Sequence, residues 1–259
     1  RSGTRVASYR PVLDSRRKTT YATGMSKRIG VLTSGGDCAG LNAVLRAVVR
    51  RVCADGGEVV GIRDGIDGLR ARPIAAAPLR PADVERDGAG GIGQGGTLLG
   101  TSNYGDPARD PGAQARVRAA YGELGLDALI GVGGDGSLRL LRGHASAAGW
   151  RLIGVPKTID NDVAGTDLAV GHASAVAAAT DALDRLRTTA ERHGRVMVLE
   201  VMGRDTGHIA LASGIAGGAD AILIPEIPPD LNAVAGHIAA RHRNGRRGSL
   251  VVVAEGVPD

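Results

Sequence analysis

The stretch RIGVLTSGGDCAGLNAVLRAVVRRV, residues 28–52, decides the fold. It opens with a short apolar run that predicts a buried β-strand, and the glycine-rich turn SGGD at Ser34–Asp37 follows at once. Apolar residues then recur at helical spacing: Leu41, Val44, Leu45, Val48, Val49 and Val52. A strand, a glycine turn and an amphipathic helix in this order make one βα unit, the repeating element of α/β proteins.

Similar units recur along the rest of the chain. Short apolar runs predict further strands at Glu58–Ile62, Leu126–Val132, Leu152–Val155, Arg195–Val201, Ala221–Ile224 and Leu250–Ala254. Helical patterns begin at about Leu138 and cover about Ala173–Glu191, whereas residues 71–96 are rich in Ala, Pro and Gly and suggest surface connections. The pattern predicts an α/β fold of two lobes, with mostly parallel sheets and helices on both faces.

We expect three parts in the chain: a disordered or non-native extension at residues 1–24, a first lobe at 25–171 and a second lobe at 172–259. The extension carries six basic residues and one acidic residue, and the remainder carries 26 of each. The whole net charge of +5 therefore lies in the extension. Because no basic patch with aromatic residues follows it, the sequence argues against a nucleic-acid-binding protein.

Membrane and redox signals point to the cytoplasm. No stretch is long and apolar enough to suggest a membrane span. Cys38 and Cys53 are the only cysteines, and they do not have the spacing of metal ligands. Two scattered thiols are typical of a reducing compartment, so we expect a cytoplasmic protein.

Two glycine turns follow predicted strands and have the composition of phosphate-binding loops. In SGGD, Gly35 and Gly36 would allow an anion to approach the backbone at a helix N-terminus, although a tight turn needs glycine for its shape alone. In GGDG, Asp135 lies where phosphates would be held, so it is a candidate Mg²⁺ ligand. The alternative is that Asp135 or Ser137 caps the next helix.

The run PKTIDND at residues 156–162 is the sharpest chemical signal. Asp160 and Asp162 lie two residues apart directly after a buried strand, and in an extended segment such side chains point the same way. One carboxylate can accept a hydroxyl proton while the other helps to position a metal-bound phosphate. Lys157 adds a compact positive charge beside them. A surface turn would explain Asp and Asn here, but not the whole run beside the two glycine turns.

Further polar residues end the strands of the second lobe. Arg204, in the segment MGR, follows one strand and is placed to reach the same edge, while Arg195 begins that strand and suggests a role towards a neighbouring subunit. Glu255 suits sugar hydroxyls, or it simply ends a strand. The six histidines show no ligand spacing and indicate structural or surface positions.

Together these segments resemble the phosphofructokinase family over about residues 27–257. The matching segments, in chain order, are IGVLTSGGDCAGLNAV, GGTLLGT, IGVGGDGS, GVPKTIDND, DALDRLRTTAERHGRVMVLEVMGR, IAGGADAILIPE and VVVAEG. The resemblance implies phosphoryl transfer to the 1-hydroxyl of fructose 6-phosphate in glycolysis, with Mg²⁺ as cofactor and Asp160 as catalytic base. It also implies a homo-oligomer, commonly a tetramer, in which Arg195 serves the adjacent subunit's sugar-phosphate site.

The resemblance also implies a role for each site residue. The catalytic group is Thr158, Asp160, Asp162 and Arg204. The donor site is Gly35, Gly36, Gly134, Asp135, Gly136, Ser137 and Lys157, with Asp135 at the metal. The sugar phosphate would be held by Thr158, Asp160, Asp162, Arg195, Met202, Gly203, Arg204 and Glu255. Positions used for allosteric effectors in bacterial members match Arg46, Arg50 and Arg187.

The phosphoryl donor stays open between ATP and pyrophosphate. In the family, Gly at both the 136 and 157 positions usually goes with ATP, and Asp followed by Lys with pyrophosphate. Gly136 with Lys157 is the mixed combination, and we favour ATP because Gly136 leaves room for a nucleotide. Two departures stand out: Ser102, Asn103 and Tyr104 lie where members often have an arginine, and a C-terminal LGHxQRGG-like motif is missing, which suggests a truncated chain.

Three rival functions remain. A catalytically impaired fragment or a nucleotide-binding regulatory subunit would explain an incomplete sugar-phosphate site, but not the intact Asp160 and Asp162 pair. An NAD kinase or lipid kinase would share GGDG, but not PKTIDND and MGR. A basic DNA-binding protein is disfavoured by the balanced charge of residues 25–259.

Overall fold

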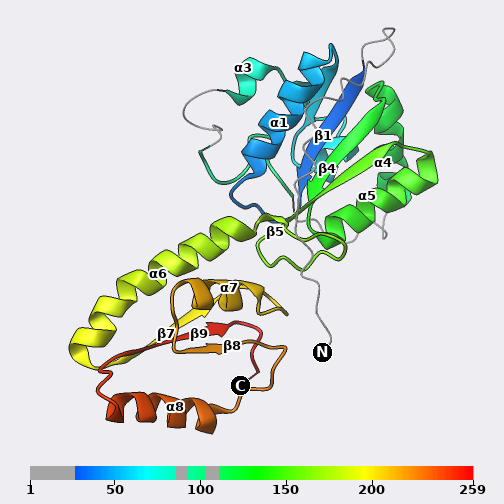
Figure 1. Cartoon of the computed structure of the whole chain (residues 1–259). Coiled ribbons are helices and arrows are strands. Elements are labelled where there is room, and N and C mark those ends of the chain that lie inside the picture. The colour runs from blue at the N-terminus through cyan, green and yellow to red at the C-terminus, as the bar shows by residue number, and fades with distance from the viewer. Residues whose placement is uncertain (1–26, 86–92, 103–110, 259) are drawn as a thin grey trace, which may run out of the picture.

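Two α/β lobes, each built on its own sheet, make up the computed structural model, which describes residues 27–85, 93–102 and 111–258 (Figure 1). The expected extension at 1–24 lies outside these residues. The first lobe contains β1 (Arg28–Ser34), α1 (Leu41–Ala54), β2 (Glu58–Ile62), α2 (Ile66–Arg70), β3 (Ala76–Pro78), α3 (Pro81–Val84), α4 (Pro111–Glu123), β4 (Ala128–Gly133), α5 (Asp135–Ala148), β5 (Leu152–Thr158) and β6 (Val170–Gly171).

The first sheet has six strands in the order β3-β2-β1-β4-β5-β6. All its neighbours are parallel except β3, which runs antiparallel to β2 at one edge. In the central register, Ser34 of β1 lies opposite Gly133 of β4, and Gly133 lies opposite Pro156 of β5. The carboxyl ends of these three strands therefore lie at one edge of the sheet.

Apolar side chains bury both faces of this sheet. Adjacent residues of β1 point to opposite faces, so Val31 packs with Leu45 and Val49 of α1, while Leu32 packs in a second cluster with Leu129 and Leu141. These side chains are between 0 and 1% exposed. The alternation explains why the run beginning at Arg28 is apolar at almost every position.

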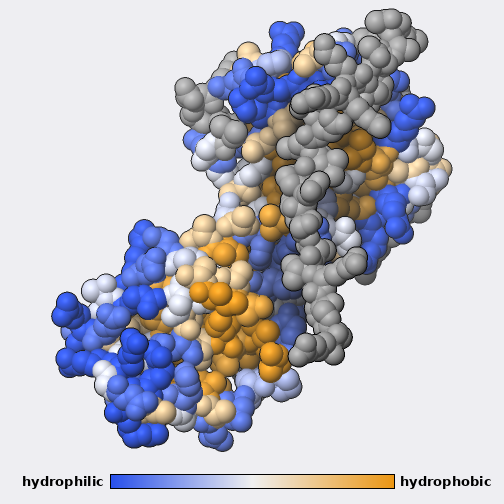
Figure 2. Space-filling model, viewed as in Figure 1, coloured by the Kyte–Doolittle hydropathy of each residue, from blue (hydrophilic) through white to orange (hydrophobic). Residues whose placement is uncertain are grey.

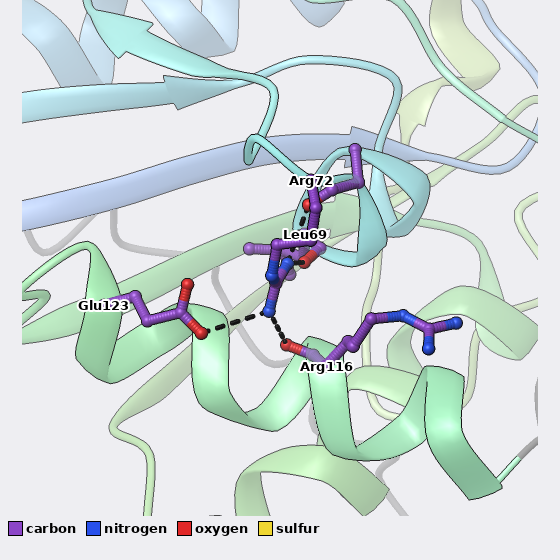
Figure 3. A network of polar contacts seen from close by, with 5 residues as sticks. Leu69, Arg72, Arg116 and Glu123 are labelled. Carbon is purple, nitrogen blue, oxygen red and sulfur yellow. Dashed lines mark hydrogen bonds and ion pairs between the residues drawn. The ribbon is translucent and has the colours of Figure 1, made fainter.

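Arg72 joins two peripheral helices of the first lobe, as Figure 3 shows. Its guanidinium donates to the Leu69 carbonyl oxygen at 2.9 Å and to the Arg116 carbonyl oxygen at 3.0 Å, and it pairs with the Glu123 carboxylate at 3.1 Å. The connection after α2 is thereby fixed to α4.

The second lobe contains α6 (His172–His193), β7 (Val196–Val201), α7 (His208–Ala216), β8 (Ala221–Leu223), α8 (Leu231–Arg243) and β9 (Ser249–Ala254). Its sheet has three parallel strands in the order β7-β9-β8. Figure 1 shows α6 leading from the first lobe along the second. Leu183 of α6, Ala210 of α7 and Val252 of β9 are buried in one apolar cluster. No helix among the described residues is long and apolar enough to cross a membrane.

The predicted fold class is confirmed, with three local corrections. Residues 71–96 are more than surface connections, because they contain β3 and α3 and bury Leu79 and Val84. The helix expected from about Leu138 begins at Asp135. The strand expected to end at Val155 continues through Thr158, because Lys157 and Thr158 pair with β6.

The helices α7 and α8 are not among the elements predicted from the sequence. The α7 segment HIALASGIA is apolar or small almost throughout, so it lacks the contrast between faces that marks an amphipathic helix. None of the α8 residues is buried, so that helix also lacks a core-facing stripe.

Candidate active site

The three polar turns singled out in the sequence follow β1, β4 and β5, which are neighbours in the sheet. Parallel strands bring their carboxyl ends to one edge, where α/β proteins bind ligands. One hydrogen bond and one close approach show that the turns meet. Lys157 donates a hydrogen bond from Nζ to the Gly36 carbonyl oxygen, and a Cβ placed on Gly134 would lie 3.5 Å from the Lys157 carbonyl oxygen.

The SGGD turn presents open backbone at this edge. Gly35 has a φ of 88°, a left-handed conformation that favours glycine. Its N–H donates to the Ser102 carbonyl oxygen at 3.1 Å, and its own carbonyl oxygen accepts from the Thr101 hydroxyl. A Cβ added at Gly36 would meet nothing within 4 Å, so there is space for a ligand beside this backbone.

The GGTLLGT segment braces that turn, a function that sequence reasoning missed. Thr33 Oγ1 lies 2.9 Å from Thr97 Oγ1 and donates to the Gly100 carbonyl oxygen at 2.7 Å. Asn42 Oδ1 accepts from the Leu98 N–H at 2.8 Å. Thr33 and Asn42 are buried polar residues, and a threonine inside an apolar strand was the available signal. Of the three residues expected to replace an arginine, Ser102 donates to the Asp64 carbonyl oxygen at 3.0 Å, and Asn103 and Tyr104 lie outside the described residues.

The GGDG turn opens α5. Asp135 and Gly136 are its first residues, and no side chain caps the helix at Gly134, so neither alternative cap is present. Ser137 is half-buried, whereas Asp135 and Gly136 are exposed. A Cβ added at Gly136 would again meet nothing within 4 Å. Both glycine turns therefore border open space, and the GGDG turn lies at the N-terminus of α5, which favours negative charge.

Lys157 lies beneath the SGGD turn. It is only 5% exposed. Burial lowers the pKa of its ammonium group, while the nearby Cys38, Asp37 and Asp160 raise it. The lysine therefore joins the SGGD turn to the turn that carries Asp160, rather than standing as a free charge.

The TIDND turn holds Asp160 half-buried after β5. Asn161 has a φ of 57°, so the segment is not extended, and the strand geometry from which the sequence placed Asp160 and Asp162 on one side is wrong. Asn161 stabilises this conformation through its own side chain, because Oδ1 accepts from the Ala169 N–H at 2.8 Å and Nδ2 donates to the Asp167 carbonyl oxygen at 3.2 Å.

Electrostatics single out the Asp160 carboxyl. Burial raises its pKa above the ordinary value, and the charges of Asp162 and Glu255 raise it further. The Thr158 hydrogen bond and the Arg204 charge lower it. These causes come from both lobes, so Asp160 lies near Asp162 after β5 and near Glu255 and Arg204 of the second lobe.

Glu255 organises the second-lobe side of the site. Its Oε1 accepts from the Gly203 N–H at 3.0 Å and the Arg204 N–H at 2.6 Å. The MGR segment is thereby fixed to the end of β9. Met202 and Arg204 stay exposed, and Arg204 Nε lies 3.6 Å from Asp205 Oδ2. The arginine is thus available to an anion.

The phosphofructokinase family profile matches residues 28–259. The chain belongs to the phosphofructokinase family. It is 52% identical over 242 residues to the ATP-dependent 6-phosphofructokinase 1 of Synechocystis sp., covering 90% of the chain and 66% of that relative. It is 51% identical over 237 residues to the ATP-dependent 6-phosphofructokinase of Chloroflexus aurantiacus, covering 89% of the chain and 65% of that relative. The chain therefore spans just under two thirds of the length of these curated relatives.

Solved phosphofructokinases share the fold. The phosphofructokinase of Saccharomyces cerevisiae superposes with a TM-score of 0.78 at 33% identity, over 90% of this chain and 34% of that one. A pyrophosphate-dependent phosphofructokinase from Marinobacter aquaeolei gives 0.72 at 26% identity, over 89% and 61% of the two chains.

Within one phosphofructokinase chain, Arg195 is remote from the other sugar-phosphate candidates. It precedes β7, whereas Arg204 follows that strand, and six residues of strand span roughly 20 Å. The expected effector arginines are also divided. Arg46 and Arg50 lie on α1 of the first lobe. Arg187 lines a pocket of about 350 Å³ in the second lobe, together with Asp220, Arg241, Arg246 and Arg247.

Among the residues that the structure describes, no group of three or more His, Cys, Asp or Glu side chains is arranged to hold a metal ion. Asp135, the expected Mg²⁺ ligand, pairs with Arg139 at 2.5 Å and is exposed. Mg²⁺ in kinases is often held by one or two carboxylates together with substrate phosphates and water. A single exposed carboxylate within an open glycine turn fits that kind of site.

Proposed function

We propose that this chain is the greater part of a 6-phosphofructokinase that transfers a phosphoryl group from ATP to the 1-hydroxyl of fructose 6-phosphate. The observation that carries the proposal is that the SGGD loop and the second lobe both come close to the turn that carries Asp160. Lys157 ties its turn to the phosphate-binding SGGD loop on one side, and Arg204 and Glu255 of the second lobe act on its charge from the other. Family membership and relatives named ATP-dependent 6-phosphofructokinase support it.

In this proposal Asp160 accepts the proton of the attacking hydroxyl. A general base is most effective when its pKa lies near the working pH, and burial moves the Asp160 pKa in that direction. Thr158 and Asp162 surround the reacting hydroxyl. Arg204, with the backbone of Met202 and Gly203 fixed by Glu255, holds the sugar phosphate.

The donor phosphates would lie along the open backbone at Gly35, Gly36, Gly134 and Gly136, with Ser137 in the same turn. Asp135 would hold Mg²⁺, which supplies positive charge to the transferring phosphoryl group when bound. The chain's own contribution is to position these phosphates against the backbone of the two turns and at the N-terminus of α5, whose partial positive charge favours anions.

ATP is the proposed donor because the space beside Gly136 is open and because the curated relatives quoted above are named as ATP-dependent. Pyrophosphate is the alternative. A coupled assay of the purified chain with each donor tests both, and we expect turnover of fructose 6-phosphate with ATP. Turnover with pyrophosphate alone would reverse the donor, and none with either donor would contradict the activity and favour the impaired or regulatory alternative.

Replacing Asp162 is expected to move the acid limb of the pH profile of kcat/KM to lower pH. The Asp162 charge raises the pKa of Asp160, so its removal in Asp162→Asn lowers that pKa. The base then stays ionised at lower pH. Measuring kcat/KM from pH 5 to 8 checks this, with Asp167→Asn, an exposed residue of the same segment, as the control. A limb that stays in place would show that Asp160 does not titrate in that range.

We also propose that the protein is a homo-oligomer. Figure 2 shows hydrophobic residues gathered on the second lobe over the region of α7 and its neighbouring strands. Leu211 and Ile215, one helical turn apart on α7, are 43% and 69% exposed. A subunit contact would bury such a face and could bring Arg195 to a neighbour's substrate.

The pocket lined by Arg187 is the proposed site of an anionic effector.

A further inference from the structure

The second lobe contacts Asp160 through its main chain. The Thr206 hydroxyl lies 3.2 Å from the Asp160 carbonyl oxygen, and His208 Nδ1 lies 3.1 Å from the same atom. A carbonyl only accepts hydrogen bonds, so Nδ1 is assigned as the donor. The Thr206 hydroxyl has a single hydrogen and also lies 3.0 Å from the Gly203 carbonyl oxygen. His208 is therefore the contact directed at Asp160 alone.

The segment from Met202 to His208 is held at both ends. Glu255 accepts two backbone N–H groups at its start, from Gly203 and Arg204. Glu226 Oε1 accepts the Gly207 N–H at 2.8 Å near its end. Between them, the Thr206 N–H donates to the Gly203 carbonyl oxygen at 2.9 Å. One braced loop thus presents both Arg204 and the two contacts to Asp160.

The TIDND turn is also held through its main chain by residues of β5 and of the start of α6. Buried His172 places Nδ1 2.7 Å from the Ile159 carbonyl oxygen. The Asp160 N–H donates to Thr158 Oγ1 at 3.2 Å. The Thr158 bond and the Asn161 side chain fix the turn to the first lobe, whereas His172 is the first residue of α6 and holds the turn where the two lobes join. The contacts of Thr206 and His208 come from the loop of the second lobe that carries Arg204.

We propose that Thr206 and His208 are positioning residues, which hold the Asp160 carbonyl oxygen to the second lobe so that the base and Arg204 keep a fixed separation. The inference rests on the proposed function. The two lobes are also joined through α6, and a small change in their angle would move Arg204 relative to Asp160. A misplacement of about 1 Å can cost about 10²-fold in rate.

His208→Leu tests the contact, because leucine fills similar space without a donor. We expect kcat to fall roughly 10- to 100-fold, while KM for fructose 6-phosphate changes by less than about threefold, since the groups that touch the sugar phosphate remain. His208→Asn keeps a donor at the position of Nδ1 and should stay near the wild-type kcat. His237→Leu, at an exposed histidine of α8, is the matched control.

Amide hydrogen exchange of the peptide covering residues 159–169 gives a second readout that needs no turnover. Faster exchange there in His208→Leu, with wild-type exchange in His208→Asn and His237→Leu, supports the inference. Wild-type kcat and exchange in His208→Leu would overturn it, and so would an equal loss of kcat in His208→Asn. If wild-type protein turns over neither ATP nor pyrophosphate, the proposed function fails, and the exchange comparison alone decides whether His208 holds the turn.

Discussion

Asp160→Asn is expected to lower the phosphoryl-transfer rate by about 10³-fold, the range of a general base in enzymes. Asparagine keeps the size of the side chain but cannot accept the hydroxyl proton. The coupled assay with ATP and fructose 6-phosphate measures the loss. Asp167→Asn is the control, because it makes the same chemical change at an exposed residue of the same segment. A variant that kept its full rate would remove Asp160 from the mechanism.

The same substitution is expected to stabilise the fold at neutral pH. The pKa of Asp160 is raised above its ordinary value of 3.8 in the folded chain, so the folded state binds this proton more tightly than the unfolded state. Stability therefore falls as pH rises through the interval from 3.8 to the folded pKa. Above that interval the folded chain holds an unfavourable charge, which asparagine removes.

Thermal unfolding checks the sign of this effect. The Tm of Asp160→Asn should exceed that of wild type by about 1–3 °C at pH 7, the scale of a modest change in a chain of this size. The difference should fade as the pH falls below 3.8, where wild-type Asp160 becomes protonated in both states. A lower Tm at pH 7 would mean that the carboxylate makes a favourable contact, and that Asp160 is not destabilised by burial. Loss of activity with a gain of stability is the pattern expected of a catalytic group held in a strained environment.

Much of this architecture could be predicted from residue patterns. The strands that lead into SGGD, GGDG and PKTIDND are continuous apolar runs. A run such as residues 28–33 has few alternatives to a buried parallel strand. Once those strands are neighbours, the rules of parallel sheets place their carboxyl ends together. The meeting of Gly36, Lys157 and Asp160 follows from topology rather than from any single motif.

The parts that could not be predicted depend on contacts between distant segments. The left-handed φ of Asn161 is stabilised by the hydrogen bonds of its side chain to the backbone of Ala169 and Asp167. No local sequence pattern predicts this conformation. The sequence predicts His208 to be a structural or surface histidine. A histidine that binds a backbone carbonyl has no characteristic spacing from other residues in the sequence that would reveal it. Its contact to Asp160 bridges 48 residues and two lobes. Residues of this kind can be identified only from a structure that shows the backbone atoms they contact.

Gly136→Asp is expected to lower kcat/KM for ATP by about 100-fold or more. The position borders open space, so the new carboxylate would extend towards the donor phosphates beside Asp135. Two adjacent carboxylates repel a polyphosphate at short range. The fold should tolerate the change, because Gly136 is the second residue of α5 and an acidic side chain in the first turn of a helix is favourable. The loss of ATP turnover would therefore come from the donor site rather than from unfolding.

Gly136→Ala separates charge from size in this experiment. Alanine adds the same Cβ into the same open space, so it should keep ATP turnover within about threefold and the Tm of wild type, as expected for an uncharged change at an exposed position. Turnover with pyrophosphate, a smaller donor, should be reduced less by the aspartate than turnover with ATP. Equal losses in the alanine and aspartate variants would show that the backbone of Gly136 is needed for its conformation. Unchanged ATP kinetics in Gly136→Asp would place the nucleotide elsewhere, because a carboxylate cannot lie beside the donor phosphates without an electrostatic cost.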